Sequence, residues 1–251
     1  MKFLRYKNNN GKEYGLLEGK DIRKIQGDLF GGYKITDTIY KLDEVKLLTP
    51  CSPGKIIAVG LNYRDHAKEL NMTIPEDPII FLKPPSSIIG PDEKIVIPSM
   101  SKQVDYEAEL AIVIKKKGKN IGQDEVKEYI LGATCLNDVT ARDLQKKDGQ
   151  WTRAKSFDTF CPIGPYIVDG LNYNNLQIKL IHNGSIKQDS STSNFIWSIK
   201  YLVSYISNIM TLDPGDIITT GTPPGVGPVQ PGDTVEVKVE GIGVLRNTVA
   251  M

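Results

Sequence analysis

The chain has 251 residues, which is enough for one sizeable core domain and a small appendage. Its 31 basic and 30 acidic residues nearly cancel, so no overall charge would attract nucleic acid or an anionic membrane. No apolar run approaches the roughly 18 residues of a membrane span, and the N-terminal segment lacks the apolar stretch of a secretory signal. We therefore expect a cytoplasmic protein that binds neither nucleic acid nor a membrane.

Cysteine and histidine are both scarce. The cysteines Cys51, Cys135 and Cys161 are widely spaced and form no CxxC pair, so free and mostly buried thiols are expected. His66 and His182 are the only histidines, and a metal site built from several histidines is therefore impossible.

In chain order, residues 1–50 are charged and turn-rich and predict a small β-rich N-terminal appendage, whereas residues 51–251 form the main domain. That domain opens with a buried strand over 56–61, a helical segment over 62–70 and a strand between prolines over 78–84. Further strands are predicted over 94–98, 105–116, 131–140, 164–170, 176–187, 216–223 and 234–249, with helices over 123–130, 140–149 and 198–210. The predicted fold class is mostly β (α+β), and no GxGxxG or P-loop motif argues for a nucleotide-binding fold.

Two segments supply candidate metal ligands. Strand alternation in DYEAELAIVI would place Asp105, Glu107 and Glu109 on one face, next to an apolar run where an unpaired carboxylate is costly. Asp138 ends the apolar segment LGATCLND, and Thr140 after it is a candidate helix cap. A hard divalent cation would offset these charges. The alternatives are a solvated edge strand for the first segment and a turn-forming aspartate for the second.

Two other segments offer reactive side chains. In NYRDHAKEL, His66 and Glu69 are three residues apart and would be neighbours on one helical face, as in a carboxylate-oriented general base. Lys155 lies in WTRAKSFDTF between small and aromatic residues, where a desolvated lysine could pair with a substrate carboxylate or an oxyanion. The alternatives are an ordinary surface helix and a surface lysine.

Six motifs in order, GLNYRDHAKEL, PIIFLKPPSSIIGP, DYEAELAIVI, NDVTARDLQ, WTRAKSFDTFCPIGP and ITTGTPPGVGP, resemble the fumarylacetoacetate hydrolase superfamily from about Lys55 to the C-terminus. The chain is most similar to short members such as acylpyruvate hydrolases, oxaloacetate decarboxylases and tautomerases, and 2-hydroxyhepta-2,4-diene-1,7-dioate isomerases. Fumarylacetoacetate hydrolase itself has a much larger N-terminal domain than the roughly fifty residues here, which makes fumarylacetoacetate an unexpected substrate.

The resemblance implies a mixed β-roll or sandwich catalytic core and a homodimer. It implies Mg²⁺ or Mn²⁺, with Ca²⁺ as an alternative, and a small-molecule 2-oxo acid substrate. By this resemblance the metal ligands are Glu107, Glu109 and Asp138, and the catalytic residues are His66, Glu69 and Lys155. Substrate contacts are expected from Arg64, Arg142, Gln145 and Thr222.

The expected chemistry passes through a metal-bound enolate of a 2-oxo acid. Water activated by His66 would hydrolyse an acylpyruvate, whereas loss of CO₂ would decarboxylate oxaloacetate, and we rank this hydrolase or decarboxylase function first. Reprotonation alone would make the protein an isomerase or tautomerase, which ranks second. A non-catalytic, metal-stabilised binding module is the third reading, and the His66–Glu69 pair disfavours it because such a module needs no general base.

Overall fold

The computed structural model describes residues 1–9 and 11–251. It is 45% strand and 16% helix, which confirms the mostly β fold class. In this described part of the chain, no helix is long and apolar enough to cross a membrane.

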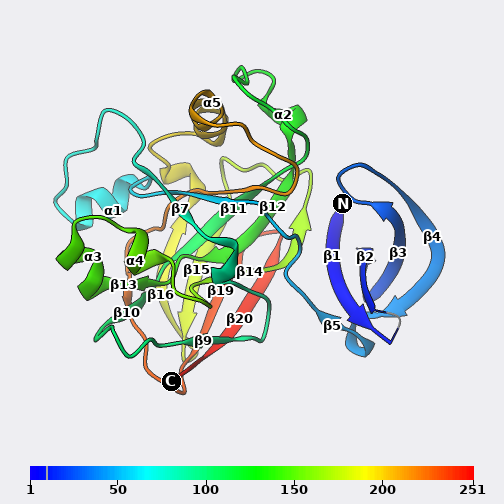
Figure 1. Cartoon of the computed structure of the whole chain (residues 1–251), viewed down its shortest axis with the longest axis horizontal. Helices are drawn as coiled ribbons and strands as arrows, with labels where there is room; N and C mark the ends of the chain where they lie inside the picture. Colours follow the sequence, from blue (N-terminus) through cyan, green and yellow to red (C-terminus); the bar gives the residue numbers. More distant parts are fainter. Residues whose placement is uncertain (10) are drawn as a thin grey trace.

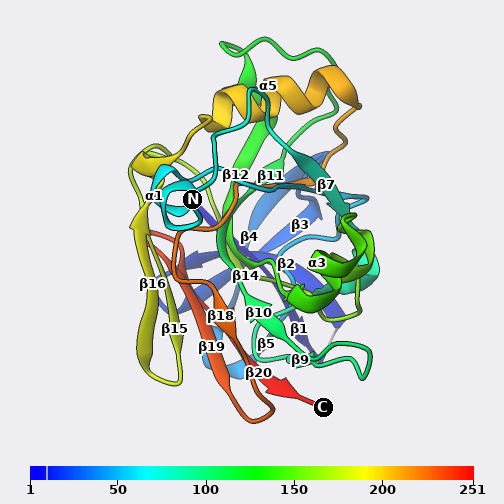
Figure 2. The same cartoon turned by 90° about the vertical axis from the view of Figure 1, so that its left-hand side faces the viewer.

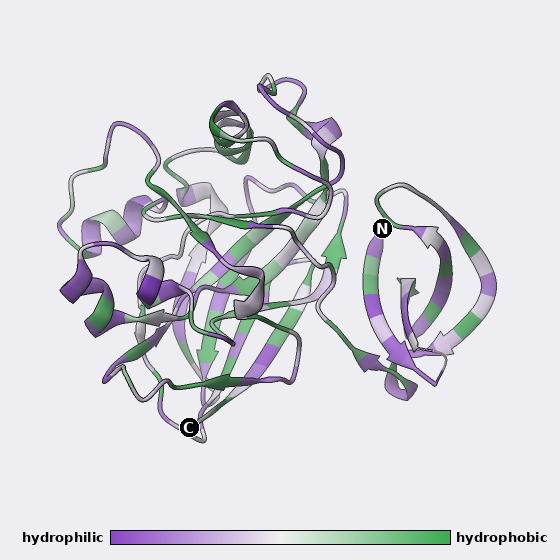
Figure 3. Ribbon diagram, in the orientation of Figure 1, coloured by the Kyte–Doolittle hydropathy of each residue, from purple (hydrophilic) through white to green (hydrophobic). Residues whose placement is uncertain are grey.

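The N-terminal unit is an antiparallel meander that lies beside the core in Figure 1. Its strands are β1 (Lys2–Asn8), β2 (Gly11–Glu18), β3 (Asp21–Asp28) and β4 (Gly32–Lys41), followed by the 3₁₀ helix η1 (Leu42–Glu44) and β5 (Lys46–Leu47). Hydropathy alternates in bands along these strands in Figure 3, as expected for a sheet with one covered face. Strand β1 also pairs with a core strand, so the unit and the core share one 12-stranded sheet.

The core continues this sheet in the order β1-β14-β12-β11-β17-β6-β7 and packs it against a 5-stranded sheet in the order β16-β15-β19-β20-β9. The bounds of the core strands are β6 (Ile56–Val59), β7 (Ile80–Lys83), β8 (Ile88–Ile89), β9 (Lys94–Val96), β10 (Val104–Tyr106), β11 (Ala108–Ile114), β12 (Ile130–Asn137), β13 (Thr140–Ala141), β14 (Cys161–Val168), β15 (Gln177–His182), β16 (Ser185–Ser191), β17 (Ile217–Thr219), β18 (Gly227–Pro228), β19 (Thr234–Val239) and β20 (Gly243–Ala250).

The helices are short, and several lie at the end of the core opposite the N-terminal unit. Their bounds are α1 (Arg64–Glu69), α2 (Val126–Tyr129), α3 (Arg142–Asp148), α4 (Thr152–Lys155) and α5 (Ile199–Ile209), with 3₁₀ helices η2 (Pro85–Ser87) and η3 (Thr192–Asn194). Helix α5 buries Ile199, Leu202, Val203 and Ile206, whose spacing of three and four residues forms one apolar stripe. In Figure 2, α1 and α3 lie on either side of the core strands.

The candidate site is built at the start of β11 and the end of β12. Every residue of β11 is buried, because strands lie on both of its edges and the second sheet covers one of its faces. The antiparallel register pairs Ala108 with Asn137 and Glu109 with Leu136. The start of β11 therefore lies beside the end of β12.

Two local predictions were wrong at this point. The strand predicted over 105–116 is interrupted at Glu107, since β10 and β11 belong to different sheets. Asp105 consequently pairs in another sheet and does not share the alternation of Glu109. Thr140 is not a helix cap, because α3 begins at Arg142, with Ala141 at its N-cap position and no side-chain cap hydrogen bond. The Thr140 hydroxyl instead donates to the Asp138 carbonyl at 2.9 Å, with the Glu107 carboxylate at 3.2 Å.

Candidate active site

Glu107, Glu109 and Asp138, hereafter the carboxylate cluster, come together where β11 begins and β12 ends. Each offers a carboxylate oxygen, and these oxygens lie within 4.8 Å of one another. The backbone sets this geometry, since the Asp138 amide donates to the Glu107 carbonyl at 2.8 Å. All three side chains are buried, so their mutual repulsion is poorly screened.

Glu109 is the least compensated member of the cluster. Its carboxylate accepts a hydrogen bond from the Gly221 amide at 2.8 Å, and it has no ion pair in the described part of the chain. Burial, with the charges of Asp138 and Glu107 added, raises the pKa of Glu109 well above its usual value. The ionised form of this carboxyl is therefore disfavoured in the ion-free protein, and a bound cation would favour it.

Glu107 has the opposite surroundings. Burial alone would raise its pKa, but the charges and hydrogen bonds of Lys155 and Arg142 outweigh it and lower the pKa to about 2. Lys155 Nζ donates to Glu107 at 2.9 Å, and the Arg142 guanidinium donates to the other carboxylate oxygen. The amide of Glu107 donates to the Asn137 side chain at 2.8 Å, which fixes the backbone at the strand break.

Three cations compensate the cluster, and one of them was not predicted. Lys155 Nζ lies 2.6 Å from Asp138, and Lys83 Nζ lies 2.6 Å from the other oxygen of the same carboxylate. Burial alone would lower the pKa of Lys155, but the charges of Asp138 and Glu107 raise it by more. The net pKa is above its usual value, so this lysine stays charged. A lone lysine inside the apolar strand PIIFLKP was the signal that could have identified Lys83, because a lysine is almost never fully buried without a partner.

The histidine pair forms as the helical spacing predicted. His66 is buried in α1, and its Nδ1 lies 2.8 Å from Glu69 Oε2. The other oxygen of Glu69 accepts from the Gly225 amide at 3.1 Å. Residues 220–227 therefore border both groups, because Gly221 reaches Glu109 and Gly225 reaches Glu69.

Gln188, on β16, connects the start of β11 to residues 222–223, and it was not predicted from the sequence. Its side-chain oxygen accepts from the Ala108 amide at 2.9 Å, between Glu107 and Glu109. Its nitrogen donates to the Thr222 hydroxyl at 2.8 Å and to the Pro223 carbonyl at 2.7 Å. Nothing local in KQDSS distinguishes this glutamine, since its role arises from the pairing of β15 with β16.

The four residues predicted to contact substrate have protein partners here, and their substrate role stays a prediction. Arg142 Nε donates to Asp105 at 2.8 Å and its Nη1 to Gln145 at 2.6 Å. The Thr222 hydroxyl donates to the Ala108 carbonyl at 2.9 Å. Arg64 donates to backbone carbonyls of 195 and 196. The three cysteines are free and buried, as predicted.

Two family models match the chain. Residues 55–250 match the model described as fumarylacetoacetate (FAA) hydrolase C-terminal, and residues 1–50 match the model described as Rv2993c-like, N-terminal. The first match contains all members of the carboxylate cluster, the three cations and the His66–Glu69 pair.

Individual proteins agree with these models. An uncharacterised protein from Methanocaldococcus jannaschii is 62% identical over 216 residues, covering 86% of this chain and 88% of that protein. The mitochondrial oxaloacetate tautomerase Fahd2a of Rattus norvegicus is 46% identical over 218 residues, covering 82% of this chain and 70% of that protein. A crystal structure of 5-carboxymethyl-2-hydroxymuconate delta-isomerase from Mycobacterium smegmatis is 44% identical, with a TM-score of 0.94 over 100% of this chain and 99% of that chain.

Proposed function

Since this chain belongs to the fumarylacetoacetate hydrolase family of enzymes, we propose that it is a Mg²⁺- or Mn²⁺-dependent tautomerase or isomerase of a small 2-oxo dicarboxylic acid, such as oxaloacetate. The observation that carries this proposal is the buried carboxylate cluster together with its three cations. The names of two relatives, an oxaloacetate tautomerase and a hydroxymuconate isomerase, support reprotonation over bond cleavage.

The donor set of the cluster fits a hard divalent cation. The three carboxylates are the ligands that Mg²⁺ and Mn²⁺ prefer, and Glu109 in particular lacks a cationic partner among the described residues. A bound cation would act as a Lewis acid on the 2-oxo group of the substrate. Lys83, Lys155 and Arg142 hold the cluster oxygens in place and keep the carboxylates from repelling one another.

The charge balance of the site favours an anionic substrate. The three carboxylates of the cluster and Asp105, which shares Arg142, face three side-chain cations, so the protein groups carry about one negative charge and a divalent ion would make the site positive. A 2-oxo acid with one or two carboxylates matches such a site.

His66 is placed to move the proton. With Nδ1 engaged by Glu69, Nε2 is the nitrogen available to take a proton from C3 of the substrate and to deliver it to the 2-oxo oxygen, which gives the enol; in the reverse direction it returns the proton to C3. Glu69 orients the ring and stabilises the imidazolium that forms. The positive charge of Lys155, which its two carboxylate partners maintain, stabilises the oxygen of the enolate between the two steps.

Exchange of substrate hydrogen in D₂O tests this function. Oxaloacetate incubated with the protein and Mg²⁺ should lose its C3 protons to deuterium, measured by proton NMR, much faster than it releases pyruvate. A His66→Ala variant is the matched control and should leave exchange near the uncatalysed rate. Exchange no faster than without protein contradicts the proposal.

Hydrolysis or decarboxylation is the second candidate, favoured by the same His66–Glu69 pair because an oriented imidazole can also activate water. Pyruvate release from oxaloacetate as fast as deuterium uptake supports decarboxylation. Pyruvate release from acetylpyruvate faster than any turnover of oxaloacetate supports hydrolysis.

Assembly and location remain proposals. We infer a homodimer of this chain in the cytoplasm, as the family resemblance and the sequence suggested. Light scattering that finds only a ~28 kDa species at micromolar concentration would contradict the dimer.

A further inference from the structure

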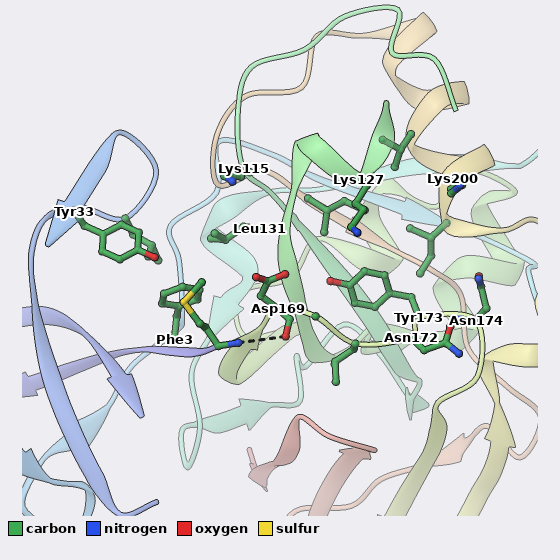
Figure 4. Close-up of a pocket in the computed structure, with 17 residues that line it drawn as sticks. Phe3, Tyr33, Lys115, Lys127, Leu131, Asp169, Asn172, Tyr173, Asn174 and Lys200 are labelled. Carbon is green, nitrogen blue, oxygen red and sulfur yellow. Dashed lines mark hydrogen bonds between the residues drawn. The ribbon is translucent and has the colours of Figure 1, made fainter. Parts of the chain in front are cut away.

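A cavity of about 390 Å³ lies between the N-terminal unit and the core (Figure 4). It is remote from the carboxylate cluster, because it adjoins the opposite ends of the same two strands. Lys115 follows the end of β11 and Ile130 opens β12, about 20 Å along the strands from the cluster. The apolar part of the lining comes from both units and comprises Phe3, Leu29, Val126, Ile130, Leu131, Leu171 and Ile199.

The charged side chains of the lining are mainly cationic. Lys115, Lys127 and Lys200 line the cavity, and none of them forms an ion pair with any residue that the structure describes. Asp169 is the carboxylate in the lining, and in Figure 4 the Tyr173 hydroxyl points towards it. Burial and, second, the charge of Asp169 raise the pKa of Tyr173 to about 12, so the phenol stays protonated.

We propose that this cavity binds a small amphipathic carboxylate, with its apolar end among the side chains of Phe3 and Leu131 and its carboxylate among the three lysines. Unpaired like charges around an apolar hollow repel one another and concentrate anions there. The volume lies within the roughly 300–1,000 Å³ usual for small-molecule sites. The three lysines are exposed at the rim of the hollow, where they disfavour an organic cation and give a neutral apolar molecule no charge to pair with.

Calorimetry with sodium octanoate and 1-octanol on the Mg²⁺-loaded full chain tests the site. Octanoate should bind with a Kd on the order of 10⁻⁴ M, while octanol, with the same chain length and no charge, should bind at least tenfold more weakly. The double variant Lys127→Glu/Lys200→Glu should weaken octanoate binding by more than tenfold.

Two controls locate the binding. Lys238→Glu, an exposed charge reversal on β19, should leave octanoate affinity unchanged. Glu109→Gln should also leave it unchanged, because this residue belongs to the carboxylate cluster; loss of octanoate binding there would mean that the probe occupies the active site and would overturn the proposal.

Three other results overturn it as well. One is the absence of octanoate binding up to millimolar concentration, and another is equal affinity for octanol. The third is that the double lysine variant changes the oligomeric state by light scattering, which would make this face an interface between copies of the chain. The experiment does not depend on which reaction the carboxylate cluster supports.

Discussion

The carboxylate cluster and the N-terminal unit both pair acidic with basic side chains, but in opposite surroundings. The side chains of Lys155 and Asp138 are 3% and 1% exposed, whereas those of Lys41 and Asp21 are 55% and 42% exposed. Water replaces a broken surface pair at little cost, while a broken buried pair leaves a charge that nothing solvates. Burial therefore decides which ion pairs matter for function and stability, and the following predictions test that contrast.

The largest effect should come from removing a member of the carboxylate cluster. Glu107→Ala, Glu109→Ala and Asp138→Ala should each abolish Mn²⁺ binding and reduce turnover by at least roughly 10²–10³-fold, because each removes an anionic ligand. Calorimetry with Mn²⁺ and the exchange assay measure the two effects. Wild-type affinity in any two of the variants would contradict the assigned ligands.

The His66→Ala variant should lower turnover by roughly 10²–10⁴-fold and leave Mn²⁺ affinity intact, since His66 transfers a proton and is not a ligand. Glu69→Gln should act in the same direction more mildly, because it keeps a hydrogen bond to the imidazole. Equal, small losses for both variants would make His66 a bystander.

Two isosteric changes on neighbouring glutamates should alter the free energy of unfolding in opposite directions, with EDTA present. Glu107→Gln should destabilise by about 1.5–3 kcal/mol, because it removes the charge that Lys155 and Arg142 share, although Asp138 and Asp105 still pair with them. Glu109→Gln should stabilise at neutral pH, since it replaces a carboxyl that resists ionisation. Urea denaturation measures both, and destabilisation by Glu109→Gln would contradict the account of its surroundings.

The pH dependence of the ion-free protein follows from the same pKa shifts. Because the folded pKa of Glu109 is raised, its contribution to stability is fully present at low pH and is lost as pH rises from the unfolded value through the folded one. The folded pKa of Glu107 is lowered to about 2. Its contribution to stability is therefore present above a pH of about 4.5 and is lost as the pH falls towards 2. Mn²⁺ should bind more tightly as pH rises, since it displaces the proton of Glu109.

Gln188→Leu should remove the buried brace between β11 and residues 222–223. The lost hydrogen bonds should cost about 1–3 kcal/mol and lower kcat by roughly tenfold, because Glu107 and Glu109 flank the freed Ala108 amide. Gln188→Glu keeps the acceptor for the Ala108 amide but places a buried carboxylate oxygen against the Pro223 carbonyl, so it should not restore the lost activity. A lower melting temperature with unchanged kcat would leave Gln188 with a purely structural role.

The smallest effect should come from the N-terminal unit. Lys41→Ala breaks the exposed pair with Asp21 and should not measurably change the unfolding midpoint or turnover. Thermal unfolding and the exchange assay check this. A loss comparable to that of Glu107→Gln would contradict the distinction between buried and exposed pairs.

The sequence by itself predicted the mostly β class and the His66–Glu69 pair. These features depend on local information, namely the apolar runs of the strands and the three-residue spacing on α1. The apolar runs also made Glu109 and Asp138 candidate ligands of a hard cation, but the set Glu107, Glu109 and Asp138 came from the resemblance of six motifs to a known family.

Only the tertiary structure revealed the break at Glu107, the buried Lys83 and the brace by Gln188. Each depends on segments far apart in the chain: Lys83 is 55 residues from Asp138, and Gln188 is 80 residues from Ala108. The local pattern at Glu107 favours a continuous strand, but pairing of β10 and β11 with different partners interrupts it. Because charge compensation and long-range hydrogen bonds are properties of packing, the sequence indicated which groups could react, and the fold decided how they are held and balanced.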